Sequence, residues 1–199
     1  MIATFVTSLV FTMVAAMTIQ SAEIMFTTQN KLGINADIRN LTQDLFSEAR
    51  ESNTFYLYSS IDSEDRDGIT DRLNDGQSGD MLALFKLEPY PTSSDPEHVS
   101  EIIIYHRDAE EEQNGPVYRT EYTFSTPSDP SASTAEQMIA TAVKGGEAIE
   151  MVDLAKGLAN DYLFFNSRDQ SVIVNGQIIH GNAAKEVTDT YNFAISPRG

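Results

Sequence analysis

The feature that most constrains this chain is an uncharged apolar segment at its N-terminus. Residues 1–19 (MIATFVTSLVFTMVAAMTI) contain no Asp, Glu, Lys or Arg. As an α-helix they would extend roughly 28 Å at about 1.5 Å per residue, close to the ~30 Å hydrocarbon core of a bilayer. Their large side chains must be covered by lipid or by other copies of the chain, because each is worth about 1.5–3 kcal/mol when removed from water. We expect an assembly surface on Phe5, Leu9, Val10, Phe11, Met13, Val14 and Met17.

Three interpretations of this segment compete. A secretory signal peptide has a basic start and a cleavage site of small residues, and a signal anchor has flanking Lys or Arg. Here the first basic residue is Lys31. The third interpretation takes Met1 as a processed N-terminus whose basic leader has been removed, which accounts for both the missing charge and the helical pattern that follows.

That helical pattern continues as an amphipathic one. Apolar residues recur at spacings of three and four, which places them on one face of a helix, at Ile34, Ile38, Leu41, Leu45 and Ala49. No proline or turn cluster precedes Asn53, so we predict one helix over residues 1–53, with residues 1–22 as its apolar segment. Gly33 and the polar stretch 18–23 are its weak points.

After residue 53 the pattern becomes strand-like, and we predict a β-rich head over residues 54–199. Alternating or continuous apolar runs indicate strands at 55–59, 81–87, 101–107, 117–124 and 190–195. Loops rather than helices join most of them, so we expect a mainly antiparallel sheet. The continuous runs at 102–105 and 172–174 predict strands covered on both faces, one of them by the long helix. The fold class is therefore α+β.

Two local motifs in the head predict further structure. Ser133 and Glu136 have the spacing of a capping box, so a helix should begin there and end near Gly145. Asn175–Gly176 stands between two β-branched runs, which is typical of a tight type I′ hairpin.

Composition excludes several functions. The net charge of −17 repels phosphates, so nucleic acid is not an expected partner. The absence of cysteine removes disulfides, thiol catalysis and Cys-ligated zinc. There is no nucleophile elbow, phosphate loop or HExxH motif, and we expect no enzymatic activity and no required cofactor.

An acidic loop after the first strand is the best metal candidate. With Gly68 sixth, as in an EF-hand calcium loop, Asp65, Asp67 and Asp71 occupy ligand positions. Ser63 and Asn74 replace the usual first and twelfth residues. The loop is therefore interpreted either as a Ca²⁺ site or as a solvated acidic turn. Separately, Asn40-Leu41-Thr42 matches the N-glycosylation triplet.

The layout of the chain resembles type IV pilins and the pseudopilins of type II secretion. Residues 1–19 resemble the apolar half of the pilin helix, and residues 37–53 (DIRNLTQDLFSEARESN) resemble its outer half. The final YNFAISPRG is similar to a pilin closing strand. Pilins carry Glu where this chain has Phe5; either the sequence begins just after that motif, or the subunit aligns its helices by packing alone.

The resemblance implies a structural subunit that polymerises through its N-terminal helix. We expect an extracellular, cell-surface filament of identical subunits, each anchored in the inner membrane before assembly. Two alternatives stay open: a pseudopilin of a short secretion filament, and a membrane-anchored domain whose head binds a ligand.

Overall fold

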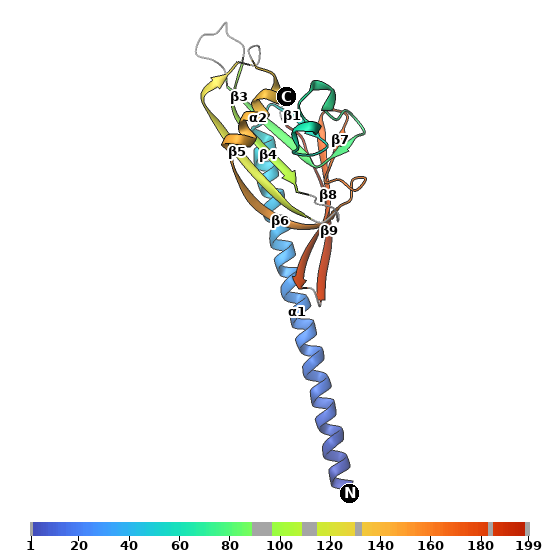
Figure 1. Ribbon diagram of the computed structural model, residues 1–199. Helices are drawn as coiled ribbons and strands as arrows, with labels where there is room; N and C mark the ends of the chain where they lie inside the picture. The colour runs from blue at the N-terminus through green and yellow to red at the C-terminus, as the bar shows by residue number, and fades with distance from the viewer. Residues whose placement is uncertain (1, 89–96, 109–114, 130–132, 183–184, 198–199) are drawn as a thin grey trace.

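The computed structural model describes residues 2–88, 97–108, 115–129, 133–182 and 185–197. Its dominant element is α1, a single helix over Ile2–Glu51. The helix starts far from the rest of the molecule and ends inside a β-rich head (Figure 1). Neither Gly33 nor residues 18–23 interrupt it, so the predicted continuous helix is confirmed. We call residues 6–25 of α1 the stalk and residues 34–49 its inner half.

The head is built on one antiparallel sheet. Its strands are β1 (Thr54–Tyr58), β2 (Ser78–Gly79), β3 (Met81–Glu88), β4 (His98–Arg107), β5 (Gly115–Ser128), β6 (Glu147–Gly157), β7 (Phe164–Ser167), β8 (Ser171–Asn182) and β9 (Lys185–Ile195). The strand order is β1-β3-β4-β5-β6-β8-β7-β2, and β9 pairs with β8. Every described strand pair is antiparallel, as loop-joined strands predict.

Helices cover both faces of the central strands. On one face, Ile103 and Tyr105 of β4 join a cluster with the inner half of α1. On the other face, Ile102 and Ile104 pack with Ile139 of a second helix, α2 (Ala135–Gly145). Alternate side chains of a strand point to opposite faces, so a strand covered twice is apolar throughout. The prediction for residues 102–105 is confirmed.

The second predicted doubly covered run behaves differently. In β8, Val172 and Val174 are fully buried, but Ile173 between them is only half-buried. This part of the sheet therefore has one face in the core and one face partly open to solvent.

Helix α2 begins one residue later than its sequence predicts. Thr134, not Ser133, is the N-cap; its hydroxyl accepts a hydrogen bond from Gln137 N, and the Gln137 side chain accepts one from Thr134 N. Glu136 is buried and pairs with Arg72 at 2.6 Å. A carboxylate held by a buried ion pair is not available to cap the helix, which is why the box shifts by one residue.

The predicted tight hairpin at Asn175–Gly176 is wrong. Both residues lie inside β8, where Asn175 pairs with Asn192 and Gly176 with Tyr191 of β9. A type I′ turn needs positive φ at both central residues, and neither residue has it. A Cβ on Gly176 would lie 2.8 Å from the Tyr191 hydroxyl oxygen. The glycine makes room for a buried tyrosine instead of turning the chain.

The actual hairpin joins β8 to β9 and extends beyond the rest of the sheet. It runs beside α1 toward the N-terminus (Figure 1). At its far end the Lys185 ammonium lies 5.9 Å from the centre of the Phe26 ring. The head thus accompanies α1 down to Phe26, and the stalk projects beyond it.

Candidate assembly surface

The stalk exposes large apolar side chains that the head does not cover. Of the predicted assembly residues, six are described, and each is at least half exposed: Leu9 (51%), Val10 (52%), Phe11 (76%), Met13 (64%), Val14 (57%) and Met17 (70%). Phe5 lies within α1, but its side chain is outside the described residues. Val6, Ile19, Ile24 and Met25 extend the same surface. The apolar surface surrounds the stalk on all sides, which is typical of a helix buried by lipid or by other helices.

Two threonine hydroxyl groups of the stalk are satisfied within the helix itself. Thr12 Oγ1 donates to Ser8 O at 2.9 Å, and Thr18 Oγ1 donates to Val14 O at 2.9 Å. Each bond reaches back one turn, as threonine does in apolar helices. These two hydroxyl groups therefore do not need water, and they do not prevent burial of this part of the stalk in an apolar environment.

The stalk also has the length and composition of a membrane-crossing segment. Within the described part of the chain, α1 is the candidate span; its most apolar stretch has a mean hydropathy of 1.6, and none of that stretch is buried. The chain thus carries an N-terminal apolar helix of the kind that serves as a membrane anchor or a signal.

An ion-pair network fixes the inner half of α1 to the sheet. Lys86 of β3 pairs with Glu48 at 2.8 Å, with Glu51 at 3.1 Å and with Glu101 at 3.0 Å. Arg119 of β5 pairs with the same Glu48 at 2.8 Å. Two cations, from the strands on either side of β4, therefore hold one helical carboxylate, which fixes the position of α1 along its own axis.

Tyr105 completes this network around Glu48, which we call the inner ion-pair network. Its hydroxyl donates to Asp44 Oδ2 at 2.5 Å, and Arg119 lies 3.3 Å from the same oxygen. Burial and then the Asp44 carboxylate raise the pKa of Tyr105. Burial alone would lower the pKa of Lys86, but its carboxylate partners outweigh this effect and raise it. Both groups therefore keep their protons throughout the neutral range.

A second contact fixes α1 to the β8–β9 hairpin. His180 Nε2 lies 2.5 Å from Asp37 Oδ2. One turn before Asp37, a Cβ on Gly33 would lie 3.1 Å from the His180 ring. Glycine costs about 1 kcal/mol in a helix relative to alanine. At Gly33 the absence of a side chain lets the His180 imidazole ring pack against the helix backbone. The helix accepts the lower propensity of glycine at this position in return for that contact.

The acidic loop forms two short 3₁₀ turns, Ser63–Asp65 and Ile69–Asp71. Asp65 Oδ2 accepts a hydrogen bond from Ser60 Oγ at 2.8 Å, and Asp71 Oδ2 accepts one from Gly68 N at 2.7 Å. The described residues contain no group of three or more His, Asp or Glu side chains placed to hold a metal ion. The calcium site on Asp65, Asp67 and Asp71 stays a prediction.

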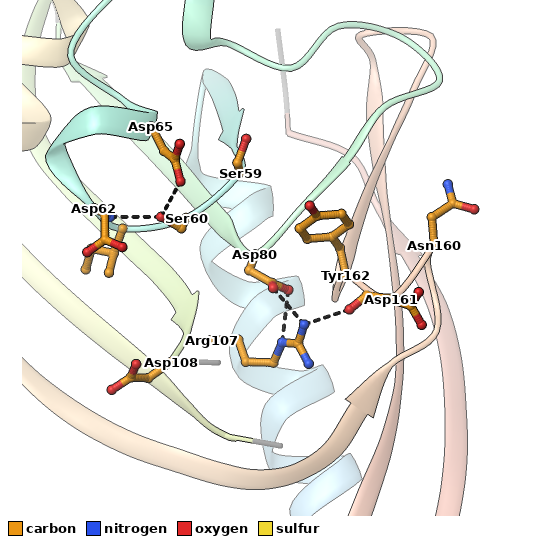
Figure 2. A pocket seen from close by; sticks show the side chains of 11 residues that line it. Ser59, Ser60, Asp62, Asp65, Asp80, Arg107, Asp108, Asn160, Asp161 and Tyr162 are labelled. Atoms are coloured by element: carbon orange, nitrogen blue, oxygen red, sulfur yellow. Dashed lines mark hydrogen bonds and ion pairs between the residues drawn. The ribbon is translucent and has the colours of Figure 1, made fainter. Parts of the chain in front are cut away.

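A pocket beside this loop contains an ion pair whose two side chains are both almost fully buried (Figure 2). Arg107 donates to Asp80 through Nε at 3.0 Å and Nη2 at 2.7 Å, and to Asp161 O at 2.7 Å. Asp80 also accepts from Leu163 N at 2.8 Å. Burial raises the pKa of Asp80 despite Arg107. These bonds hold a loop in which Asn160 and Asp161 have positive φ, so the pair has a structural role.

The structure also shows the surroundings of the glycosylation candidate and of one buried histidine. Asn40 lies on an exposed face of α1, and its glycosylation stays a prediction. His106 of β4 is buried and stacks on Tyr118 of β5 with ring centres 5.4 Å apart. Burial lowers the pKa of His106, which favours its neutral form in the folded head.

Sequence reasoning missed the residues that join the helix to the head. Lys86 and Arg119 are single cations inside strands of a strongly acidic chain, and that contrast was the available signal. Their partner Glu48 is separated from Arg119 by 71 positions, so the pairing itself could not be predicted.

The comparisons with known proteins give no family. No protein-family model matches this chain, and no curated protein and no solved structure matches it significantly.

Proposed function

We propose that this chain is a structural subunit that polymerises through the stalk into an extracellular filament of the type IV pilus kind. The observation that carries the proposal is the contrast within α1: its inner half is fixed in the head, while the stalk presents apolar side chains that no described part of the chain covers. Other stalks provide such a cover, as lipid does before assembly.

Two features of the sequence and fold support helix-to-helix packing of stalks. Small residues, among them Ala3, Ala15 and Ala16, permit close approach of helix backbones. The helix runs unbroken from the stalk into the head, where the ion-pair network fixes its inner half to the sheet. A subunit whose contacts with its copies do not close on themselves generates a helical polymer.

The acidic head suits the outer surface of such a polymer. All charged residues follow Ala22, and the net charge of the chain is −17. Stalks gathered in the centre would place the heads outside, where like charge keeps the assembly soluble.

Electron microscopy of material sheared from the surface of native cells tests the proposal, with mass spectrometry to identify this chain. Long, thin helical filaments rich in the protein are the expected result. Short filaments confined to the envelope would favour a secretion pseudopilin. Protein found in membranes without filaments would overturn polymerisation and favour the membrane-anchored binding domain, for which the apolar helix is equally suited.

A further inference from the structure

The outer edge of β9 is a long strand edge that is open to pairing. β9 has eleven residues, and within the described residues it pairs only with β8. The opposite edge strand, β1, is partly covered: Leu57 O accepts from Leu73 N at 2.8 Å and Ser59 O accepts from Asp80 N at 3.0 Å. An uncovered edge presents unpaired N–H and C=O groups to other strands.

The register of β8 identifies which groups β9 presents. Asn175 N donates to Leu163 O and Asn175 O accepts from Leu158 N, so the odd-numbered residues of β8 bond away from β9. The even-numbered ones therefore bond to β9, and Tyr191 is opposite Gly176. In an antiparallel hydrogen-bonded pair both residues exchange their backbone bonds. The outward backbone groups of β9 thus belong to Glu186, Thr188, Thr190, Asn192 and Ala194, and all five residues are exposed.

One of these outward groups already has a local partner. Thr190 N donates to the carboxylate of its neighbour, Asp189 Oδ1, at 2.9 Å. The bond agrees with the outward direction derived from the register. It also occupies the N–H at the middle of the strand, so pairing at this point exchanges the Asp189 carboxylate for a backbone carbonyl.

We infer that the β9 edge pairs with the β9 edge of a second copy of this chain, antiparallel and centred on Thr190. This register uses the whole strand, because Thr190 is its central residue. It keeps outward-facing residues opposite each other, with Thr188 opposite Asn192 of the second copy.

Charge also favours this register. Lys185 falls opposite Ile195, Asp189 falls opposite Tyr191, and Glu186 falls opposite Ala194, so no like charges meet across the pair. A register centred on Asp189 would place two carboxylates opposite each other, which is destabilising. Because the strand matches its own reversed copy in both hydrogen-bonding groups and charge, we infer a second copy of this chain as the partner and not an unrelated protein.

The direction of β9 relative to α1 determines how two paired subunits are oriented. β9 runs beside α1 (Figure 1), and a twofold axis through Thr190 reverses the strand direction. The two stalks therefore point in opposite directions. The β9 pair links subunits of two separate assemblies side by side, and it does not depend on polymerisation through the stalk.

Single-cysteine crosslinking of the full-length chain in detergent tests the register, since the chain has no cysteine. Hydrogen-bonded partners have Cα atoms about 5.5 Å apart, within disulfide range. Thr190→Cys should form a linked dimer by itself. Thr188→Cys and Asn192→Cys should each stay without a covalent link when alone and should link to each other when mixed. Efficient self-linking of Thr188→Cys, or no linking of the mixture, would overturn the register.

Two further variants separate edge pairing from other association. Thr190→Pro removes an outward N–H that the β8 ladder does not use, and proline is tolerated on an edge. It should leave the melting temperature of the head unchanged and weaken dimerisation by about tenfold, the equivalent of one or two hydrogen bonds. Asp189→Ala frees the Thr190 N–H and should strengthen dimerisation. Equal dimerisation of Thr190→Pro and wild type would overturn the proposal.

The same variants distinguish this inference from the proposed function. Thr190→Pro should still form filaments but lose their side-by-side bundles, whereas loss of stalk apolarity should abolish filaments and leave β9 crosslinking intact. Bundles that persist in Thr190→Pro filaments would place the lateral contact elsewhere.

Discussion

The two halves of α1 contain similar apolar residues in very different surroundings. In the inner half, Leu41 and Leu45 are each 1% exposed. In the stalk, Leu9 is 51% and Phe11 76% exposed. The inner half is amphipathic and needs one covered face, which the sheet supplies. The stalk is apolar on all sides and needs cover all round, which one head cannot give. The same helix therefore stabilises the fold at one end and is available for assembly at the other.

Removing residues 1–22 should have the largest effect. We expect the head to remain folded and to form nothing larger than the β9-paired dimer, because the described contacts of the head begin at Phe26 and the core begins at Ile34. Sedimentation and electron microscopy of the truncated chain measure this outcome, with the full-length chain as the control. A truncated chain that still polymerised would contradict assembly through the stalk.

A matched pair of leucine substitutions compares the two halves directly. Leu45→Ala should lower the free energy of unfolding of the head by about 3 kcal/mol, since it leaves a cavity against the sheet. Leu9→Ala should leave head unfolding unchanged and weaken filaments, by about 1.5–3 kcal/mol for each buried leucine. Denaturant unfolding in mild detergent and the dissociation temperature of filaments are the two measurements. Equal effects of both substitutions on head unfolding would contradict the division of α1 into an inner half that stabilises the fold and a stalk that serves assembly.

Removing the cation at the centre of the inner ion-pair network should have a smaller effect on the free energy of unfolding. Lys86→Ala leaves Glu48, Glu51 and Glu101 close together without their cation. We expect a loss of about 2–3 kcal/mol in unfolding free energy, less than for a fully buried pair because the Lys86 side chain is 17% exposed. Lys31→Ala, at an exposed position of the same helix, is the control and should change little. A loss as small as that of the control would show that the network contributes specificity without stability.

The smallest effect concerns Gly33. Gly33→Ala should gain up to about 1 kcal/mol of helix propensity, but its Cβ presses on the His180 ring at 3.1 Å. In a His180→Ala background the contact is gone, so Gly33→Ala should stabilise the head more than it does in wild type. A double-mutant cycle of unfolding free energies measures the coupling. Additive effects would indicate that the ring moves aside at no cost.

The parts of the fold that follow from local patterns could be predicted from the sequence. The spacing from Ile34 to Ala49 predicted the helix face that enters the core, and the run at residues 102–105 predicted a strand between two layers. The uncharged run at residues 1–19 likewise identified the apolar side chains that are exposed on the stalk. In each case the signal lies within a few residues and is repeated.

Predictions failed where distant contacts outweigh a short motif. Asn175–Gly176 prefers a turn locally, but β8 is paired on both of its edges, with β9 on one side and with β7 and β6 on the other. Those ladders keep the two residues extended. Glu136 has the spacing of a capping residue, but Arg72, 64 positions away, takes its carboxylate. The network around Glu48 was not predicted for the same reason, since its members lie on four separate elements, α1, β3, β4 and β5.

The attachment of α1 has a mechanical consequence. Phe26, Asp37, Glu48 and Glu51 contact the head at successive levels of the helix. Tension along α1 acts parallel to this interface, so it enters the head as shear and loads these contacts together. Peeling would break them one after another at low force. A subunit pulled along its helix should therefore resist extraction far better than one whose helix is bent away from the sheet.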